Sequence, residues 1–240
     1  MKIKNKISEY YKKRNGYQGP LYEYESTVLS FLKQGVTLLD VGCGRTFPMA
    51  KKWLKSGANV LGVDPVGDAS LVPPGSKIYK GNAEKIPLND NEIDVVVSCA
   101  VLEHIVCPEQ LFEECRRVLK PGGRIIHLTP SRYDYVSIAA QLIPNSLHGK
   151  IVKFTEGRDE MDTFPTFYRA NSFKQIKALA KEAGFEIESF RYLDQSPYVL
   201  KSWPVLYRFA SYYHYIVRSV PWFNFLNGWI LCVLNKSQSS

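Results

Sequence analysis

The chain alternates between short runs of apolar and β-branched residues and longer segments whose apolar residues recur at helical spacing. The runs predict strands at residues 36–41, 58–64, 76–81, 92–98, 122–130, 186–193 and 229–236. Helical spacing predicts helices at residues 24–34, 108–119, 133–143 and 172–184, and a further helix between Pro48 and Gly57. This alternation predicts an α/β fold with a mostly parallel sheet covered on both faces. A ligand is then expected at the carboxyl ends of the strands.

Two insertions interrupt the alternation, at about residues 131–170 and 195–228. We therefore divide the chain into a basic N-terminal arm and helix, residues 1–34, and a domain at residues 35–240 that carries both insertions. Within the second insertion, Val205–Arg218 forms a two-faced helical pattern. One face holds Leu206, Phe209, Ala210, Tyr213, Ile216 and Val217, and the other holds Arg208, Ser211, His214, Tyr215 and Arg218. We favour a helical lid that packs on the sheet by its apolar face over a helix lying on a membrane.

Composition favours one globular domain that stays in the cytoplasm. Of the 240 residues, 45% are hydrophobic and 22% are charged, as in ordinary folded domains. The lysine-rich N-terminus is not followed by the apolar stretch of a secretory signal, and every apolar run is shorter than the roughly 18 to 20 residues of a membrane span. The five cysteines are scattered and form no Cys-x-x-Cys pair, which is typical of reduced thiols.

The positive charge lies at the two ends of the chain. The formal net charge is +8, of which residues 1–20 contribute +5 and residues 194–240 contribute +3. Solvated ends would explain this distribution, and so would contact with an anionic surface or substrate. The second interpretation predicts a cytoplasmic protein in peripheral contact with the inner face of an anionic membrane. No specific nucleic-acid partner is indicated, and the sequence specifies no oligomeric state.

Residues 38–48, LLDVGCGRTFP, run from a strand through a glycine turn towards a helix. Gly42 and Gly44 match the first two glycines of the dinucleotide-binding pattern. Phe47 stands where the third glycine would let helix and strand pack closely beside a pyrophosphate. The turn therefore favours a cofactor without a pyrophosphate, and S-adenosylmethionine is such a cofactor.

Further residues stand where this cofactor needs them. Asp64 ends the next strand, twenty residues after Gly44, where an acceptor for ribose hydroxyls is expected. Asp40 lies inside an apolar strand, where a carboxylate is costly to bury without a partner. We expect it to accept hydrogen bonds from turn amides or, through water, from the cofactor's amino group. After the third strand, the Ala83 amide is a candidate donor to adenine, and Glu84 is expected nearby.

Four motifs resemble those of class I S-adenosylmethionine-dependent methyltransferases, specifically the methyltransferase-11-like group. They are LLDVGCG, VDP, GNAEKIPLNDNEIDVVVSCAVLEHI and LKPGGRIIHLTP, in this order and spacing. The resemblance implies a Rossmann-like, doubly wound, seven-stranded sheet with an antiparallel last strand, and S-adenosylmethionine as cofactor. The cofactor-binding residues that it implies are Asp40, Gly42, Gly44, Asp64, Ala83, Glu84 and Cys99. Arg45 departs from the family pattern, because a glycine commonly stands there.

His104, in the LEHI stretch after the fourth predicted strand, is the leading candidate for a catalytic base. A histidine at this position equally suits a loop-holding role. His127 lies in the middle of a strand and is expected to be packed, while His148 and Tyr133 are second candidates. His214 belongs to the C-terminal segment.

The LEHI stretch also resembles that of ubiquinone-biosynthesis O-methyltransferases, in which a glutamate completes a divalent-metal site. Ala100 occupies the corresponding position here. Glu103 and His104 alone offer too few oxygen ligands for a hard cation, so we predict that the enzyme holds no metal.

The acceptor side is expected to lie in the two insertions. Residues 155–171 mix charged and aromatic side chains, which suits a polyhydroxylated or phosphorylated ligand as well as a solvated loop. A weaker resemblance to methyltransferases of bacterial envelope and polysaccharide gene neighbourhoods points to O-methylation of a small molecule, a glycan or a lipid-linked sugar. A methyltransferase acting on RNA or protein, and a cofactor-binding module without catalysis, are the alternatives.

Overall fold

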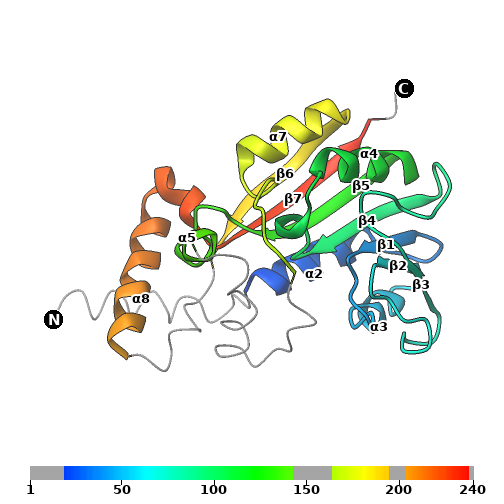
Figure 1. Ribbon diagram of the computed structural model, residues 1–240, viewed down its shortest axis with the longest axis horizontal. Helices are drawn as coiled ribbons and strands as arrows, with labels where there is room; N and C mark the ends of the chain where they lie inside the picture. Colours follow the sequence, from blue (N-terminus) through cyan, green and yellow to red (C-terminus); the bar gives the residue numbers. More distant parts are fainter. Residues whose placement is uncertain (1–18, 143–163, 195–203, 238–240) are drawn as a thin grey trace.

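A seven-stranded sheet forms the centre of the protein, seen in a computed structural model that describes residues 19–142, 164–194 and 204–237. The strands are β1 (Thr37–Val41), β2 (Asn59–Asp64), β3 (Ser76–Lys80), β4 (Ile93–Cys99), β5 (Leu119–Pro130), β6 (Phe185–Leu193) and β7 (Trp229–Lys236). Their order across the sheet is β3-β2-β1-β4-β5-β7-β6 (Figure 1). The strand β7 runs antiparallel to both neighbours, whereas the other neighbouring strands pair in parallel. This confirms the predicted fold class.

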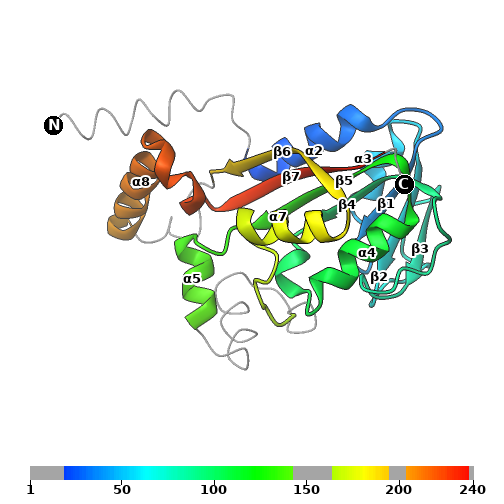
Figure 2. The same cartoon turned by 90° about the horizontal axis from the view of Figure 1, so that it is seen from above.

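Helices cover both faces of the sheet, as the alternating pattern predicts (Figures 1 and 2). One face carries α4 (Pro108–Val118) and α7 (Phe173–Glu182), and the other carries α2 (Pro20–Phe31) and α3 (Ala50–Leu54). Beyond the carboxyl ends of the parallel strands lie α5 (Tyr135–Leu142) and α8 (Pro204–Ser219). Two short 3-10 helices, η1 (Leu102–His104) and η4 (Pro221–Leu226), lie at the same edge.

Each face of the sheet has its own apolar core because side chains alternate along the strands. In β1, Leu39 packs towards α4 and α7, while Leu38 packs towards α2 and α3. The helix α4 buries Leu111, Phe112, Cys115 and Val118, a stripe with helical spacing. The two cores pack the sheet against both helix layers and fix the position of its carboxyl edge.

The largest differences from the predicted boundaries concern the first two helices. The helix α2 begins at Pro20, in the first-turn position where a proline needs no hydrogen-bond donor, and ends at Phe31 because Leu32 is extended. The helix α3 is only five residues long. Phe47 has a positive φ of 47°, which delays the helix beyond the glycine turn. Gly57, with φ of 79°, lies two residues past the C-cap residue Lys55.

The C-terminal helix α8 forms where predicted, but it packs by a different face. Its buried residues are Ser211, His214 and Val217. Phe209, which the predicted lid would bury, is 69% exposed. The reason lies outside the helix: His214 Nδ1 lies 2.9 Å from the buried carboxylate oxygen Oδ1 of Asp194, at the end of β6. This polar contact rotates the packed face away from the apolar stripe, so the prediction of a lid packed by that stripe was wrong.

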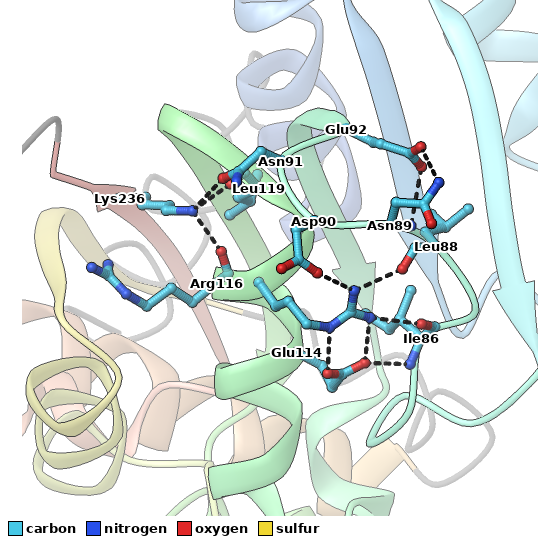
Figure 3. A network of polar contacts seen from close by, with 11 residues as sticks. Ile86, Leu88, Asn89, Asp90, Asn91, Glu92, Glu114, Arg116, Leu119 and Lys236 are labelled. Atoms are coloured by element: carbon cyan, nitrogen blue, oxygen red, sulfur yellow. Dashed lines mark hydrogen bonds and ion pairs between the residues drawn. The ribbon is translucent and has the colours of Figure 1, made fainter. Parts of the chain in front are cut away.

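At the amino ends of β4 and β5, opposite the carboxyl edge of the sheet, charged side chains form a network of hydrogen bonds and ion pairs (Figure 3). Arg117 donates hydrogen bonds to the carbonyls of Ile86 and Leu88 and to the carboxylates of Glu114 and Asp90. Lys236, at the end of β7, is 8% exposed. Its ammonium group donates to Asn91 Oδ1 at 2.9 Å and to the carbonyls of Arg116, at 2.8 Å, and Leu119. A groove of about 650 Å³ opens beside these residues.

We predict that Lys236→Met lowers the free energy of unfolding by about 1–3 kcal/mol, because it leaves buried carbonyl oxygens without a donor. Lys174→Met, on the exposed side of α7, is the matched control and should change stability by less than about 0.5 kcal/mol. Urea unfolding of the three proteins measures the difference. Equal stability of both variants would show that the Lys236 hydrogen bonds contribute nothing.

Candidate cofactor and active site

The strand order reverses between β1 and β4, and this switch point is where open α/β sheets bind ligands. The glycine turn follows β1, and η1 follows β4. The two segments touch, since a Cβ atom built on Gly42 would lie 2.4 Å from Cγ2 of Val101. No other residue type fits there without displacing Val101, so Gly42 brings the two ends of the site together.

Hydrogen bonds tie the turn to the end of β2. Gly42 and Gly44 have φ of 73° and 76°, in the left-handed region that glycine adopts readily. The Gly42 amide donates to the Val63 carbonyl at 2.8 Å, and the Gly44 amide donates to Oδ2 of Asp64 at 2.8 Å. A Cβ atom on Gly44 would meet nothing within 4 Å, so open space lies beside this residue.

Phe47 points into the core and not towards this space. Its side chain is completely buried in the core on the α2 and α3 side. The ring lies directly over Gly62 of β2, where an added Cβ would be 2.8 Å from Phe47 Cε1 and 2.6 Å from Cys43 Sγ. The close packing that a third glycine provides in dinucleotide-binding domains is therefore provided here by Gly62. The ring leaves the ligand side of the turn open.

Asp64 lies at the carboxyl end of β2, as predicted, and is 7% exposed. Its Oδ2 accepts from Gly44 and its Oδ1 accepts from the Val66 amide at 3.0 Å. Each carboxylate oxygen has a second lone pair. Asp64 can therefore hold the turn and still accept hydrogen bonds from a ligand's hydroxyl groups.

Asp40 is more deeply buried, and its partner differs from the one expected. Its Oδ2 accepts a hydrogen bond from the indole nitrogen of Trp53 at 3.2 Å, while the Gly44 amide donates to Asp64 instead. The prediction that turn amides donate to Asp40 was therefore wrong, because the hydrogen-bond donor is Trp53 of α3. Burial, helped by the nearby charge of Asp64, raises the pKa of Asp40 to about 7 against the opposing effect of the Trp53 hydrogen bond. A buried carboxyl of this kind favours a cationic ligand.

The other predicted cofactor residues lie along the same edge. Ala83 and Glu84 form a turn after β3, in which the Lys85 amide donates to the Asn82 carbonyl at 3.1 Å. Lys80, at the end of β3, pairs in register with Asp64, so this turn begins beside the end of β2.

Cys99 is the last residue of β4. Burial raises the pKa of its thiol to about 12, so it is a neutral wall of the site and not a nucleophile.

His104 is held by its Nδ1 atom, which lies 2.9 Å from the Pro165 carbonyl oxygen. Because a carbonyl oxygen only accepts, Nδ1 carries the hydrogen, and in the neutral ring Nε2 has the lone pair. Nε2 lies 3.9 Å from Oε1 of Glu103, and the His104 side chain is 30% exposed. The His104 amide donates to Val101, the residue that touches Gly42. The loop contact considered for His104 is therefore present, and its role as a base stays a prediction.

A buried polar network behind His104 was not among the predicted site residues. Thr129 Oγ1 donates to Oε2 of Glu103 at 3.2 Å, and Asn171 Nδ2 donates to Thr129 Oγ1 at 2.7 Å. Burial raises the pKa of Glu103, while the neighbouring His104 lowers it. Polar residues at the end of the apolar run 122–130 and just before the helix at 172–184 were the available signal. Their pairing depends on contacts distant in the sequence.

The remaining candidates for catalysis lie apart from this network or outside the described residues. His127 is completely buried, donates or accepts through Nδ1 at 2.6 Å from Ser98 Oγ, and has its pKa lowered to about 3 by burial. Its expected packing is confirmed. Tyr133 packs edge to face on Phe225. His148 lies outside the described residues, and His214 packs beside Asp194.

The acceptor loop is described only from residue 164 onwards, so its acidic part, residues 156–162, lies outside the described residues. Phe164 stacks edge to face on His104, with ring centroids 6.0 Å apart. The Phe167 amide donates to the Glu103 carbonyl at 2.7 Å, and Arg169 donates to the Val106 carbonyl at 2.6 Å. The described end of the loop therefore closes over η1.

Within the described ranges, no group of three or more His, Cys, Asp and Glu residues is placed to hold a metal ion. Metal independence stays a prediction. The same ranges contain no helix long and apolar enough to span a membrane. The groove of about 650 Å³ lies at the opposite edge, among paired charges, and is not the site that the turn, Asp64 and His104 define.

Comparison with known proteins agrees with this geometry. Residues 39–127 match the family described as a methyltransferase domain. A Mycolicibacterium smegmatis protein named "Probable S-adenosylmethionine-dependent methyltransferase" is 31% identical over 159 residues, covering 64% of this chain and 53% of that protein. The ubiquinone biosynthesis O-methyltransferase of Dechloromonas aromatica is 29% identical over 154 residues, covering 54% of this chain and 65% of that protein. The chain thus spans between about half and two thirds of the length of these relatives.

The fold is shared with a solved S-adenosylmethionine-dependent methyltransferase from Mesorhizobium loti. The TM-score is 0.57 at 15% identity, covering 91% of this chain and 98% of that one. Residues 39–127 thus match a methyltransferase domain, and the chain is similar in sequence and fold to class I S-adenosylmethionine-dependent methyltransferases. S-adenosylmethionine is the cofactor of this class, and the open space beside Gly44 and the buried Asp40 carboxyl fit its bulk and positive charge.

We predict that Asp40→Asn gains stability relative to the wild type as the pH rises from about 4 to 7. Below this window both the folded and the unfolded wild type hold the proton. Within it, the unfolded chain releases the proton while the folded protein, with a pKa of about 7, retains it, so the free energy of unfolding falls. The loss is on the order of 4 kcal/mol by linkage and is absent in the Asn variant. Urea unfolding at several pH values measures it. A stability difference that does not change with pH would contradict the burial of an ionisable Asp40.

Proposed function

We propose that the protein transfers the methyl group of S-adenosylmethionine to a hydroxyl oxygen of its acceptor, with His104 as the general base. The observation that carries this proposal is the state of the His104 ring. The Pro165 carbonyl holds Nδ1–H, which leaves the lone pair on Nε2, and His104 ends η1, whose N-cap residue Val101 touches Gly42.

The cofactor supplies a methyl group that is electrophilic because it is bound to a sulfonium. The turn would leave room for the ligand beside Gly44, Asp64 would accept from its hydroxyl groups, and Asp40 would favour its positive charge. When bound, the cofactor would give up its methyl carbon to the acceptor oxygen and keep the electron pair of the broken carbon–sulfur bond on sulfur. The hydroxyl proton passes to Nε2 of His104. Holding the two reacting atoms together can itself supply roughly 7–11 kcal/mol of the barrier reduction.

Glu103 acts through His104 and serves as a positioning residue. When Nε2 takes the proton, the ring becomes positively charged 3.9 Å from Oε1 of Glu103. The carboxylate stabilises that charge, and Thr129 holds the carboxylate through Oε2. The cost of burying Glu103 is thereby offset in the state that follows proton transfer.

The acceptor is proposed at the level of chemical class. The named relatives include ubiquinone biosynthesis O-methyltransferases, which supports a hydroxyl acceptor. Phe164 stacks on His104, and Phe167 and Arg169 form a cation–π pair with 5.7 Å between guanidinium and ring centroid. These groups suit a small molecule, a glycan or a lipid-linked sugar that presents a hydroxyl against aromatic faces.

We predict that His104→Asn lowers kcat by about 10²- to 10⁴-fold, the usual contribution of a positioned base. Asparagine retains a nitrogen donor near the position of Nδ1, so the contact with Pro165 is preserved while the basic nitrogen is lost. The affinity for S-adenosylhomocysteine should stay unchanged. The acceptor is first identified from cell extracts, as a compound that gains one labelled methyl group when the wild-type enzyme and labelled cofactor are present.

Full activity of His104→Asn would leave only the loop contact for this residue and remove the base from the mechanism. Label that enters RNA or protein in place of a small acceptor would favour the alternative substrate class. Cofactor binding without labelling of any acceptor would favour a binding module.

A further inference from the structure

Exposed apolar side chains gather on α8 and η4. On α8, Val205, Phe209 and Tyr212 follow the spacing of one helical stripe, and Leu206 lies beside them. On η4, Trp222 is 87% exposed, and Phe223 and Phe225 are also exposed. We call these seven residues the α8–η4 surface. Exposed apolar residues also occur singly elsewhere and are ordinary, but seven on two adjoining elements indicate an interaction site.

Contacts on the buried side of α8 fix the orientation of this surface. His214 lies against Asp194, and its ring packs edge to face on Tyr135 of α5 with centroids 5.7 Å apart. Tyr213 donates from its hydroxyl group to the Leu226 carbonyl at 2.9 Å, which joins α8 to η4. The side of the helix that bears Ser211, His214 and Val217 is thus the packed one. The apolar stripe is therefore directed away from the protein by specific contacts.

The charged residues of α8 and η4 have one sign. The two elements contain two arginines and no Asp or Glu. Arg208 and Arg218, both exposed, lie on α8 itself. Amphipathic helices with a basic face and exposed aromatic residues lie at the boundary between lipid headgroups and acyl chains. An indole ring favours that boundary, because its apolar body and its N–H group meet different environments there.

We propose that the α8–η4 surface binds an anionic lipid bilayer, with Trp222 and Phe209 at the headgroup boundary and Arg208 and Arg218 facing the lipid phosphates. The inference goes beyond the proposed function and does not depend on it. The surface adjoins the acceptor side, since Phe225 of η4 packs on Tyr133 with ring centroids 5.6 Å apart. Both lie at the carboxyl edge of the parallel strands (Figure 2). A lipid-linked acceptor would then enter the site from the bilayer on which the protein lies.

The test is sedimentation of the full chain with vesicles of phosphatidylcholine and phosphatidylglycerol in equal parts. We expect binding to these vesicles and much weaker binding to pure phosphatidylcholine. Arg208→Glu with Arg218→Glu should lower partitioning by about twentyfold or more, because each arginine near an anionic surface contributes roughly fivefold. Lys174→Glu with Lys181→Glu, two exposed positions on α7, is the matched control with the same change in net charge. It should lower partitioning far less.

The apolar contribution is tested separately. Phe209→Ser with Trp222→Ser should lower partitioning at least about tenfold. Leu71→Ser, at a side chain that is 49% exposed on another part of the protein, should leave it unchanged. Folding of each variant is checked by its affinity for S-adenosylhomocysteine. His104→Asn should bind vesicles as the wild type does, so failure of the proposed chemistry and failure of membrane binding are distinguishable.

Three results would overturn the proposal. The wild type fails to sediment with the anionic vesicles, or the α7 control pair lowers partitioning as much as the α8 pair. Alternatively, the wild type forms dimers in sedimentation velocity that Phe209→Ser with Trp222→Ser abolishes, without any vesicle binding. That last result would assign the surface to a second copy of the chain.

Discussion

The hydrogen bond from the Gly44 amide to the Asp64 carboxylate holds the turn on which the rest of the site depends. It joins the end of β1 to the end of β2, while Gly42 packs on Val101 after β4. The ends of three neighbouring strands therefore meet at one point, through the side chains of Asp64 and Val101. The positive φ of both residues and the close approach to Val101 favour glycine at both positions, and open space lies beside Gly44. The contact between Gly42 and Val101 also positions His104, because the His104 amide donates a hydrogen bond to the Val101 carbonyl.

The two edges of the sheet use buried charge in different ways. At the amino edge, Arg117 and Lys236 donate to carbonyls and carboxylates in a closed network, which stabilises the connections between elements. At the carboxyl edge, Asp40 has one indole donor and Asp64 retains spare lone pairs. Buried carboxyl groups with few donors cost free energy in the absence of a ligand. A ligand that binds to them restores what burial removes, and this distinguishes the candidate site from the groove beside Lys236.

The sequence predicted those features that local pattern determines. The last strand, residues 229–236, has the predicted bounds, and the glycine turn lies at the predicted strand end. The direction of Phe47 could not be predicted, because it depends on Gly62 of the next strand. The packed face of α8 depends on Asp194, twenty residues before His214. The contacts of Glu103 with Thr129 and of Thr129 with Asn171 join residues that no short motif links. In each case a polar or steric contact between distant segments outweighed the local apolar pattern.

The most direct test of the account is calorimetric titration of S-adenosylhomocysteine into Gly44→Ala and Gly35→Ala. Both glycines have a positive φ, of 76° and 85°, and an added Cβ would meet nothing within 4 Å at either position. The two substitutions therefore carry similar backbone strain, but only Gly44 borders the candidate site. The account predicts wild-type affinity for Gly35→Ala and an affinity at least about tenfold lower for Gly44→Ala, a difference of 1.4 kcal/mol or more. Equal affinities in the two variants would contradict it.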